Sequence, residues 1–273
     1  MSSATRRLVA LDIDGTVLLE DETFSPGVAE AVHRAVAQGH LVTLATGRSW
    51  EATSHVLHEL EITPEYVVCS NGAAILIRDE DSETGYARHF TEQFDATEVL
   101  ELLETHLPDA NYLVELPDGT RLYTHFVEDW GLHRENARKV TLEEMKGLMV
   151  SRVVVVSPDH TEQDFVDMVD QMGLNQVSYA VGWTAWLDIA PKGVDKGTAL
   201  ERVRELTGFA HENIVVIGDG RNDIGMFRWA AEHGGRAFAM GQAPEDVTHA
   251  ATDITDDVED GGVATAFQTL GLL

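Results

Sequence analysis

Short apolar runs alternate with amphipathic segments near both ends of the chain. The first run, Leu8–Leu11 followed by Ile13, predicts a strand that is buried on both faces, which is typical of the centre of a parallel sheet. His40–Ala45 and Tyr66–Cys69 are predicted as the next two strands. The segments between them are predicted as helices, from about Ser25 to Gly39 and from Ser49 to Leu60, and Ala73–Ile77 as a returning hairpin strand. This alternation predicts a parallel sheet covered by helices.

The same alternation returns after Pro191. Lys196–Leu206 is predicted as a helix with Asp195 as its N-cap, and Asn213–Ile217 as a buried strand. Further predicted elements are the helix Ile224–Ala231, the strands Arg236–Ala239 and Thr252–Ile254, and a closing helix Gly262–Leu270. One parallel-sheet domain is therefore expected to be split by an insertion.

The middle of the chain has a different pattern. The acidic segment Asp79–Gly85 is expected to be a domain boundary or hinge, with a second hinge near Ala190–Gly193. Between them, strands are predicted at Tyr86–Phe90, Asn111–Glu115, Arg121–Thr124, Arg152–Val156, Val177–Val181 and Ala185–Ile189, and helices at Ala96–Leu107 and Thr161–Met172. The predicted class is α/β, with a Rossmann-like core of residues 1–83 and 191–273 and an inserted α+β domain of residues 84–190.

Composition narrows the range of partners. The chain has 273 residues, of which 44% are hydrophobic, and a formal net charge of -28 from 47 acidic and 19 basic residues. Such a surface repels nucleic acid and anionic membranes, so neither is expected as a partner. An anionic substrate would need a local positive site, built from a metal ion, a few basic side chains or helix N-termini.

The single cysteine and the N-terminus bear on the compartment. Cys69 lies in an apolar run, so a buried, inert thiol is expected and no intramolecular disulfide can form. Met1–Arg7 lacks the apolar stretch of a signal peptide, and no apolar run approaches the roughly 20 residues that span a bilayer. A cytoplasmic protein is expected, and the sequence favours no particular oligomeric state.

Polar residues follow the predicted strands at their carboxyl ends. Asp12, Thr46 and Asn71 each come just after one of the first three strands, and Asp219 follows the strand after Pro191. The carboxyl ends of parallel strands share one edge of a sheet, where α/β proteins bind their ligands. An Asp-Gly turn with solvated carboxylates is the alternative for Asp12 and Asp14. A calcium loop fits poorly, because Val17 stands where such a loop needs glycine.

Carboxylates, a hydroxyl and an ammonium group at one edge suit phosphoryl transfer. Carboxylates can hold a Mg²⁺ ion that neutralises charge on the transferring group. Lys196 and Thr46 can bind its remaining oxygens. A carboxylate that the metal does not fully occupy can attack phosphorus and form an aspartyl-phosphate.

These stretches resemble the four motifs of the haloacid dehalogenase (HAD) superfamily of phosphatases. The most specific are Asp12-Ile13-Asp14-Gly15-Thr16 and Gly218-Asp219-Gly220-Arg221-Asn222-Asp223, with further matches at Thr46-Gly47-Arg48, Ser70-Asn71-Gly72 and Pro191–Gly197. The resemblance covers the whole chain. The insert, between the second and third motifs, resembles the type C2 cap of the Cof-like branch, subfamily IIB, whose members act on sugar phosphates.

The resemblance implies a role for each matching residue. Asp12 would be the nucleophile, and Asp14 would protonate the leaving alcohol and then activate water. Phosphoryl oxygens would be bound by Thr46 and Lys196. The remaining implied roles are Mg²⁺ binding by Asp12, the Asp14 backbone carbonyl, Asp219 and Asp223, orientation of the phosphoryl group by Asn222, and substrate binding by Gly47, Arg48 and Asn71. A small phosphorylated metabolite, such as a sugar phosphate, is the expected substrate.

Each of these residues also has an ordinary structural interpretation. Asp219 and Asp223 could cap the following helix, and Arg48 and Asn71 could belong to a helix start and a turn. Lys192 competes with Lys196, although a lysine at a helix start is unfavourable unless an anion is near. In the insert, His125, Trp130, His133, Trp183 and Trp186 are more typical of packing or surface positions, and Asp188 could face the site.

Two other functions share these features. A phosphomutase on the same fold would use the same residues. A signalling module that carries a phospho-aspartate would also place acidic groups, a hydroxyl and a lysine at strand ends, but such modules are about half this length and have no large insert.

Overall fold

The computed structural model describes residues 5–125, 136–157, 177–181 and 186–273. The predicted helix Thr161–Met172 and the side chains of Trp130, His133 and Trp183 lie outside these ranges. Within them, no helix has both the length and the apolar character that crossing a bilayer requires.

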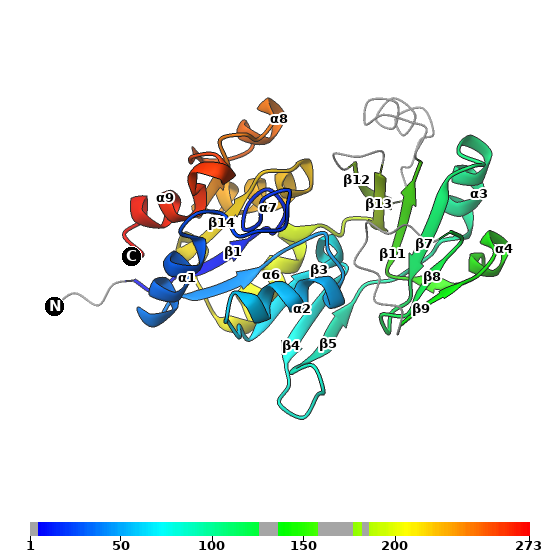
Figure 1. Ribbon diagram of the computed structural model, residues 1–273, viewed down its shortest axis with the longest axis horizontal. Helices are drawn as coiled ribbons and strands as arrows, with labels where there is room; N and C mark the ends of the chain where they lie inside the picture. The colour runs from blue at the N-terminus through cyan, green and yellow to red at the C-terminus, as the bar shows by residue number, and fades with distance from the viewer. Residues whose placement is uncertain (1–4, 126–135, 158–176, 182–185) are drawn as a thin grey trace.

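The core is a five-stranded parallel sheet with the order β16-β15-β14-β1-β2 (Figure 1). The central strand β1 (Leu8–Leu11) pairs in register with two strands far apart in sequence, since Val9 lies opposite Val215 on one side and Val42 on the other. The other strands are β2 (Leu41–Leu44), β14 (Ile214–Gly218), β15 (Arg236–Ala239) and β16 (Asp253–Ile254). The predicted parallel sheet, interrupted in sequence by the insert, is thus confirmed.

Helices cover both faces of this sheet, because alternate residues of β1 point to opposite sides. Val9 and Leu11 pack in one apolar cluster with α1 (Val28–Ala37), α2 (Trp50–Glu59) and α9 (Gly262–Thr269). Leu8 and Ala10 pack in another with α6 (Lys196–Thr207) and α7 (Ile224–Glu232). The short helices of the core are α8 (Glu245–Thr248) and the 3-10 turns η1 (Ser70–Gly72), η4 (His211–Asn213), η5 (Arg221–Asp223) and η6 (Val258–Asp260).

Strand β3 (Tyr66–Cys69) lies between the main sheet and a second, antiparallel sheet. It contacts the edge of the main sheet through the parallel bridge between Ala45 and Val68 and through hydrogen bonds from Thr43 Oγ1 to the Tyr66 carbonyl and from the Thr46 backbone N–H to the Val68 carbonyl. With β4 (Ala74–Arg78) and β5 (Tyr86–Thr91) it forms an antiparallel sheet. Residues 79–85, expected to be a hinge, are therefore the turn of the β4–β5 hairpin that projects at the lower centre of Figure 1. The next strand, β6 (Phe94–Asp95), pairs with β10 (Met149–Val150), which lies far along the chain.

The insert is a six-stranded sheet with the order β12-β13-β11-β7-β8-β9. Its strands are β7 (Asn111–Glu115), β8 (Arg121–Tyr123), β9 (Ala137–Lys139), β11 (Arg152–Val156), β12 (Val177–Val181) and β13 (Trp186–Pro191). Helix α3 (Thr97–His106) packs on one face through Val99, Leu100 and Leu103. The pair β6 (Phe94–Asp95) and β10 (Met149–Val150), the strand β9 and the helix α4 (Leu142–Met145) were not predicted, since each has only two to four residues.

Charged side chains meet where the insert sheet contacts the core. Arg88 Nη2 lies 2.8 Å from Glu115 Oε1, Arg152 Nε 2.6 Å from Asp188 Oδ1, and Arg121 Nη2 3.9 Å from Glu51 Oε2. We call these six residues the junction cluster. Glu51 and Arg88 come from the core elements α2 and β5, and the other four from the insert sheet. Two of these buried or largely buried pairs, Arg88–Glu115 and Arg121–Glu51, join the insert to the core, and Arg152–Asp188 lies within the insert. The junction cluster has equal numbers of positive and negative groups.

Candidate active site

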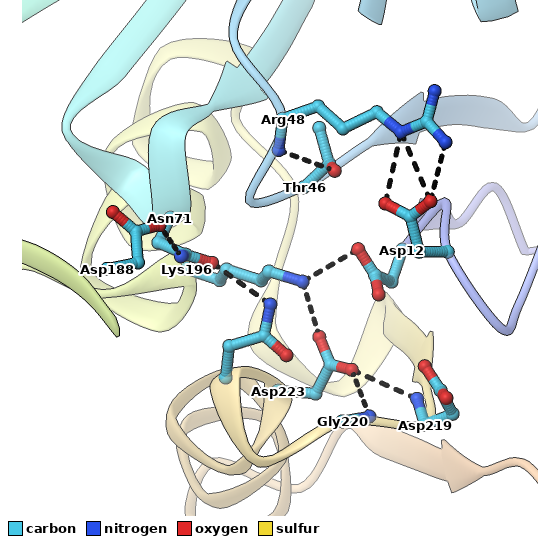
Figure 2. Close-up of polar contacts among 11 residues, drawn as sticks. Asp12, Thr46, Arg48, Asn71, Asp188, Lys196, Asp219, Gly220 and Asp223 are labelled. Atoms are coloured by element: carbon cyan, nitrogen blue, oxygen red, sulfur yellow. Dashed lines mark hydrogen bonds and ion pairs between the residues drawn. The ribbon is translucent and has the colours of Figure 1, made fainter. Parts of the chain in front are cut away.

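The carboxyl ends of β1 and β14 bring together residues that lie far apart in the sequence. Asp12 directly follows β1, and its backbone N–H donates to the carbonyl of Ile217 at 2.9 Å. Asp219 directly follows β14. With Asp223 and Lys196 they form a buried group that we call the acidic cluster (Figure 2).

Lys196 lies at the centre of the acidic cluster. It is the first residue of α6, whose N-cap Asp195 accepts a hydrogen bond from the Thr198 backbone N–H at 2.8 Å. Its Nζ donates to Asp12 Oδ1 and to Asp223 Oδ1, both at 2.7 Å. Burial opposes the charge on the ammonium group, but the charges of Asp12 and Asp223 outweigh burial and raise the pKa of Lys196. The competing Lys192 is exposed and stands outside these contacts.

Asp223 is held from two sides. Its Oδ1 accepts the hydrogen bond from Lys196, and its Oδ2 accepts from the backbone N–H groups of Asp219 and Gly220 at 2.9 Å each. Asp223 therefore closes the turn after β14, as the ordinary structural interpretation requires, and also faces the acidic cluster. The two interpretations are compatible.

Two glycines make room for these carboxylates. A Cβ atom on Gly15, whose φ is +70°, would lie 2.2 Å from Asp219 Oδ2. A Cβ atom on Gly218 would lie 2.3 Å from Asp223 Oδ2. Real Cβ contacts are never this short, so any other residue at either position would displace an acidic side chain.

The acidic cluster has more negative than positive groups. Oxygens of Asp12, Asp219 and Asp223 lie within 4.8 Å of one another, and Lys196 is the one cation in hydrogen-bond contact with them among the described residues. Burial, reinforced by the neighbouring carboxylates, raises the pKa of Asp12 to about 7 and that of Asp219 to about 8. Carboxylate oxygens are the ligands that Mg²⁺ prefers, so the donor set fits a divalent cation that would keep these groups ionised.

Asp14 lies apart from the acidic cluster. Its carboxylate is 58% exposed and is bound by the guanidinium group of Arg48, with Nη2 2.6 Å from Oδ1 and Nε 3.0 Å from Oδ2. Arg48 Nη2 also contacts Glu22 at 3.2 Å. The Asp14 side chain therefore lies at the solvent-exposed rim of the candidate active site. Arg48 holds it there through two contacts, because the planar guanidinium group matches the two oxygens of a carboxylate.

The motif Thr46-Gly47-Arg48 also lies at the candidate active site. Thr46 is buried, and its Oγ1 accepts a hydrogen bond from the Arg48 backbone N–H at 3.0 Å. A Cβ atom on Gly47 would lie 3.2 Å from both terminal atoms of the Asn71 amide and 3.5 Å from Asn222 Nδ2. Asn222 Nδ2 in turn donates to Asn71 Oδ1 at 3.1 Å. The predicted substrate-binding residues Gly47, Asn71 and Asn222 thus lie together.

Three residues near the site were not among those predicted for it. Gln242 Nε2 donates to the Gly15 carbonyl at 2.6 Å, and its Oε1 accepts from Val258 N. Glu22 approaches Arg48, and Asp188 accepts from Asn71 Nδ2 at 2.5 Å. The position of Asp188, on the strand that precedes the motif Pro191–Gly197, indicated that it could face the site. Nothing in the sequence indicated this for Gln242 or Glu22.

The chain is similar to curated bacterial proteins along most of its length. It is 26% identical over 263 residues to the 5-amino-6-(5-phospho-D-ribitylamino)uracil phosphatase YitU of Bacillus subtilis, covering 94% of each chain. It is 27% identical over 267 residues to the pyridoxal phosphate phosphatase YbhA of Escherichia coli, covering 93% of this chain and 94% of the relative.

Solved structures with the same fold cover almost the whole chain. The HAD subclass IIB sugar phosphatase BT4131 superposes with a TM-score of 0.80 at 20% identity, over 98% of this chain and all of the other. A haloacid dehalogenase-like hydrolase from B. subtilis gives a TM-score of 0.80 at 19% identity, over 97% and 99%. The family model of the haloacid dehalogenase-like hydrolases matches residues 9–267, and the chain therefore belongs to that family of hydrolases.

Proposed function

We propose that this hydrolase is a Mg²⁺-dependent phosphatase that cleaves small phosphomonoesters through an aspartyl-phosphate on Asp12. The observation that carries the proposal is the acidic cluster, in which buried carboxylates outnumber the one ammonium group that contacts them. The phosphatase names of the relatives in Bacillus subtilis and Escherichia coli support the same reaction class.

The acidic cluster supplies the groups that would hold the metal. The side chains of Asp12, Asp219 and Asp223 and the backbone carbonyl of Asp14 are the proposed ligands. A bound Mg²⁺ would neutralise negative charge on the phosphoryl group and on the carboxylates around it.

In the proposed reaction, Asp12 attacks the phosphorus atom. Lys196 holds Asp12 Oδ1, which leaves Oδ2 to form the new bond as the bond from phosphorus to the ester oxygen breaks. The ammonium group of Lys196 and the hydroxyl of Thr46 stabilise the phosphoryl oxygens. Asp14 gives its proton to the leaving alcohol, then takes one from the water that hydrolyses the aspartyl-phosphate.

The exposed position of Asp14 suits this role. A group that meets first an alcohol and then water must reach the open side of the site, and the Asp14 carboxylate is at the rim. Arg48 binds that carboxylate and lies beside Thr46, so it could also bind an anionic group of the substrate. We assign Gly47, Asn71 and Asn222 to the same substrate-binding side.

We propose that residues 1 to about 92 and 191–273 form the core domain and that the residues between them form the cap. The contacts of Arg88 with Glu115 and of Asn71 with Asp188, each between a core residue and a residue of the insert sheet, support this division. A cap in this position would limit the access of water to the site and select among substrates. The named relatives act on phosphate esters of small metabolites, and we propose a substrate of that class.

Hydrolysis of p-nitrophenyl phosphate with Mg²⁺ tests the proposal. Wild-type protein is expected to release phosphate, and Asp12→Asn, which removes the nucleophile while keeping its size, is expected to have no measurable turnover. The matched control is Asp81→Asn, an exposed carboxylate in the β4–β5 turn, which should keep full activity. Wild-type rates in Asp12→Asn would exclude this nucleophile. With a sugar phosphate as substrate, free phosphate supports a phosphatase, whereas an isomerised product identifies a phosphomutase.

A further inference from the structure

A chain of hydrogen bonds runs from the insert sheet into the candidate active site. Arg152 Nε donates to Asp188 Oδ1 at 2.6 Å, and Asp188 Oδ2 accepts from Asn71 Nδ2 at 2.5 Å. Asn71 Oδ1 then accepts from Asn222 Nδ2 at 3.1 Å. Figure 2 shows the contact of Asp188 with Asn71 beside the buried Lys196.

The chemistry of Asp188 fixes the direction of this chain. A carboxylate can only accept hydrogen bonds, and Asp188 accepts one from Arg152 and one from Asn71. Asn71 must therefore turn its NH₂ group towards Asp188 and its carbonyl oxygen towards Asn222. Asn222 must in turn direct its own NH₂ group to Asn71. One acceptor-only group thus sets the orientation of two amides that could otherwise rotate by half a turn.

The orientation of Asn222 matters because its NH₂ group lies against the motif Thr46-Gly47-Arg48. A Cβ atom on Gly47 would be 3.5 Å from Asn222 Nδ2, whereas one on Gly220 would be 2.5 Å from Asn222 Oδ1. The donor end of this amide therefore faces the Thr46–Arg48 loop, where phosphoryl oxygens are proposed to bind. If the amide rotated, an acceptor oxygen would face the anionic group instead.

We propose that Asp188, a residue of the insert, is a positioning residue that orients Asn222 through Asn71. Asn71 Nδ2 donates to Asp188 and its Oδ1 accepts from Asn222, so Asn71 transmits orientation between these two residues and keeps a second N–H for a substrate. The hydrogen bond from Asn71 in the core to Asp188 in the insert then links the position of the insert to the orientation of the Asn222 NH₂ group, which would donate to the phosphoryl group. This inference rests on the proposed phosphatase function.

Steady-state hydrolysis of p-nitrophenyl phosphate by a double-mutant cycle tests the proposal. Asp188→Asn is expected to lower kcat about tenfold, the effect of one misdirected hydrogen bond to a charged group, with the KM and the Mg²⁺ activation midpoint unchanged. Asn71→Gly removes the transmitting amide but suits the left-handed backbone at this position, where φ is 51°. In the Asn71→Gly background, Asp188→Asn should cost less than about twofold, because the two residues act in one chain.

A matched variant separates positioning from general docking of the insert. Glu115→Gln weakens another buried contact between insert and core, to Arg88 and Ser70, without touching Asn71. It should change kcat less than Asp188→Asn. An equal loss in Glu115→Gln, or additive losses in the Asn71→Gly/Asp188→Asn double variant, would overturn the proposal. If Asp188→Asn does not fold, Arg152→Gln/Asp188→Asn removes both charges of the pair and leaves neither unpaired.

A readout without turnover distinguishes this inference from the proposed function. The side-chain NH₂ signals of Asn222 in a ¹⁵N–¹H NMR spectrum should shift in Asp188→Asn, although Asn222 does not contact Asp188, and should stay in place in Glu115→Gln. An unchanged Asn222 signal in Asp188→Asn would overturn the inference. A protein that shows these shifts but does not hydrolyse phosphomonoesters would instead contradict the proposed function alone.

Discussion

The acidic cluster and the junction cluster are both buried groups of charged side chains, but they differ in charge balance. In the junction cluster, three arginines face three carboxylates, and each arginine has a carboxylate within 4.0 Å. In the acidic cluster, Lys196 alone faces Asp12, Asp219 and Asp223. The formal charges of the junction cluster therefore sum to zero, whereas those of the acidic cluster leave an excess of negative charge.

This difference separates a structural role from a functional one. A balanced set of buried ion pairs joins two parts of a chain and needs no further ligand. An unbalanced set destabilises the fold until protons or a cation bind, and the raised pKa values of Asp12 and Asp219 express that cost. Charge balance, rather than the number of charged groups, therefore marks the candidate active site.

The strongest test of this contrast is Asp219→Asn. We expect a loss of about a thousandfold or more in kcat/KM for p-nitrophenyl phosphate, because a proposed ligand for the metal is removed. Without Mg²⁺ the same variant should have a higher Tm than the wild type, because an amide carries no charge to bury.

Removing Mg²⁺ with EDTA should inactivate the wild type reversibly. A fully active Asp219→Asn, or one with a lower metal-free Tm, would contradict the role assigned to the acidic cluster.

Glu115→Gln should have the opposite effect. It leaves Arg88 buried without its charged partner, so we expect a loss of about 3 kcal/mol in the free energy of unfolding. Urea denaturation measures this loss. Glu80→Gln is the matched control, since Glu80 forms an ion pair with Arg78 at 2.7 Å but is 81% exposed. That change should cost less than about 1 kcal/mol, and equal losses in the two variants would remove the distinction between the clusters.

The pH dependence of stability offers a further test. Because burial raises the pKa values of Asp12 and Asp219 from the ordinary 3.8 to about 7 and about 8, the metal-free folded state binds more protons than the unfolded state between these limits. Stability therefore falls as pH rises from about 4 to about 8, by roughly 2 kcal/mol or more. The slope, measured by urea denaturation without metal, should be shallower in Asp219→Asn and with Mg²⁺ bound. Identical slopes in all three would contradict the raised pKa values.

The smallest expected effect concerns the surface, where the excess of acidic residues is spread out. With a net charge of -28, repulsion between exposed carboxylates should lower stability at low ionic strength. Raising KCl from 0.1 M to 1 M shortens the Debye length from about 10 Å to about 3 Å. We expect a gain of about 1 kcal/mol in the wild type and in Glu115→Gln alike, because screening acts on exposed charges more than on buried ones. A gain confined to one of them would show that the junction cluster is accessible to salt.

The sequence predicts the core well because its information is local. The apolar run before Asp12 and the turn after Gly218 identify two strand ends, and the rule that parallel strands share an edge then places Asp12 and Asp219 together. Lys196 is favoured over Lys192 by its position in the motif Pro191–Gly197 that resembles the HAD superfamily, and its place at a helix start is unfavourable unless an anion is near. These inferences need only neighbouring residues and one rule of topology.

Long-range polar pairing could not be inferred in this way. The partner of Asn71 is Asp188, 117 positions away, and Asp14 turns to Arg48 rather than to the acidic cluster. The acidic segment 79–85 has the composition of a hinge, yet the pairing of Arg78 with Tyr86 makes it a hairpin turn. Composition alone does not distinguish the two, because both are polar and exposed.

Gly15 and Gly218 contribute no functional group, yet carboxylate oxygens occupy the space that their side chains would fill. Saturation mutagenesis scored by loss of activity should therefore rank both positions beside the aspartates themselves. Even alanine, the mildest replacement elsewhere, would be rejected at each. The positions of this enzyme that tolerate the fewest substitutions would then include two residues without a side chain, because the space beside them is needed by the carboxylates.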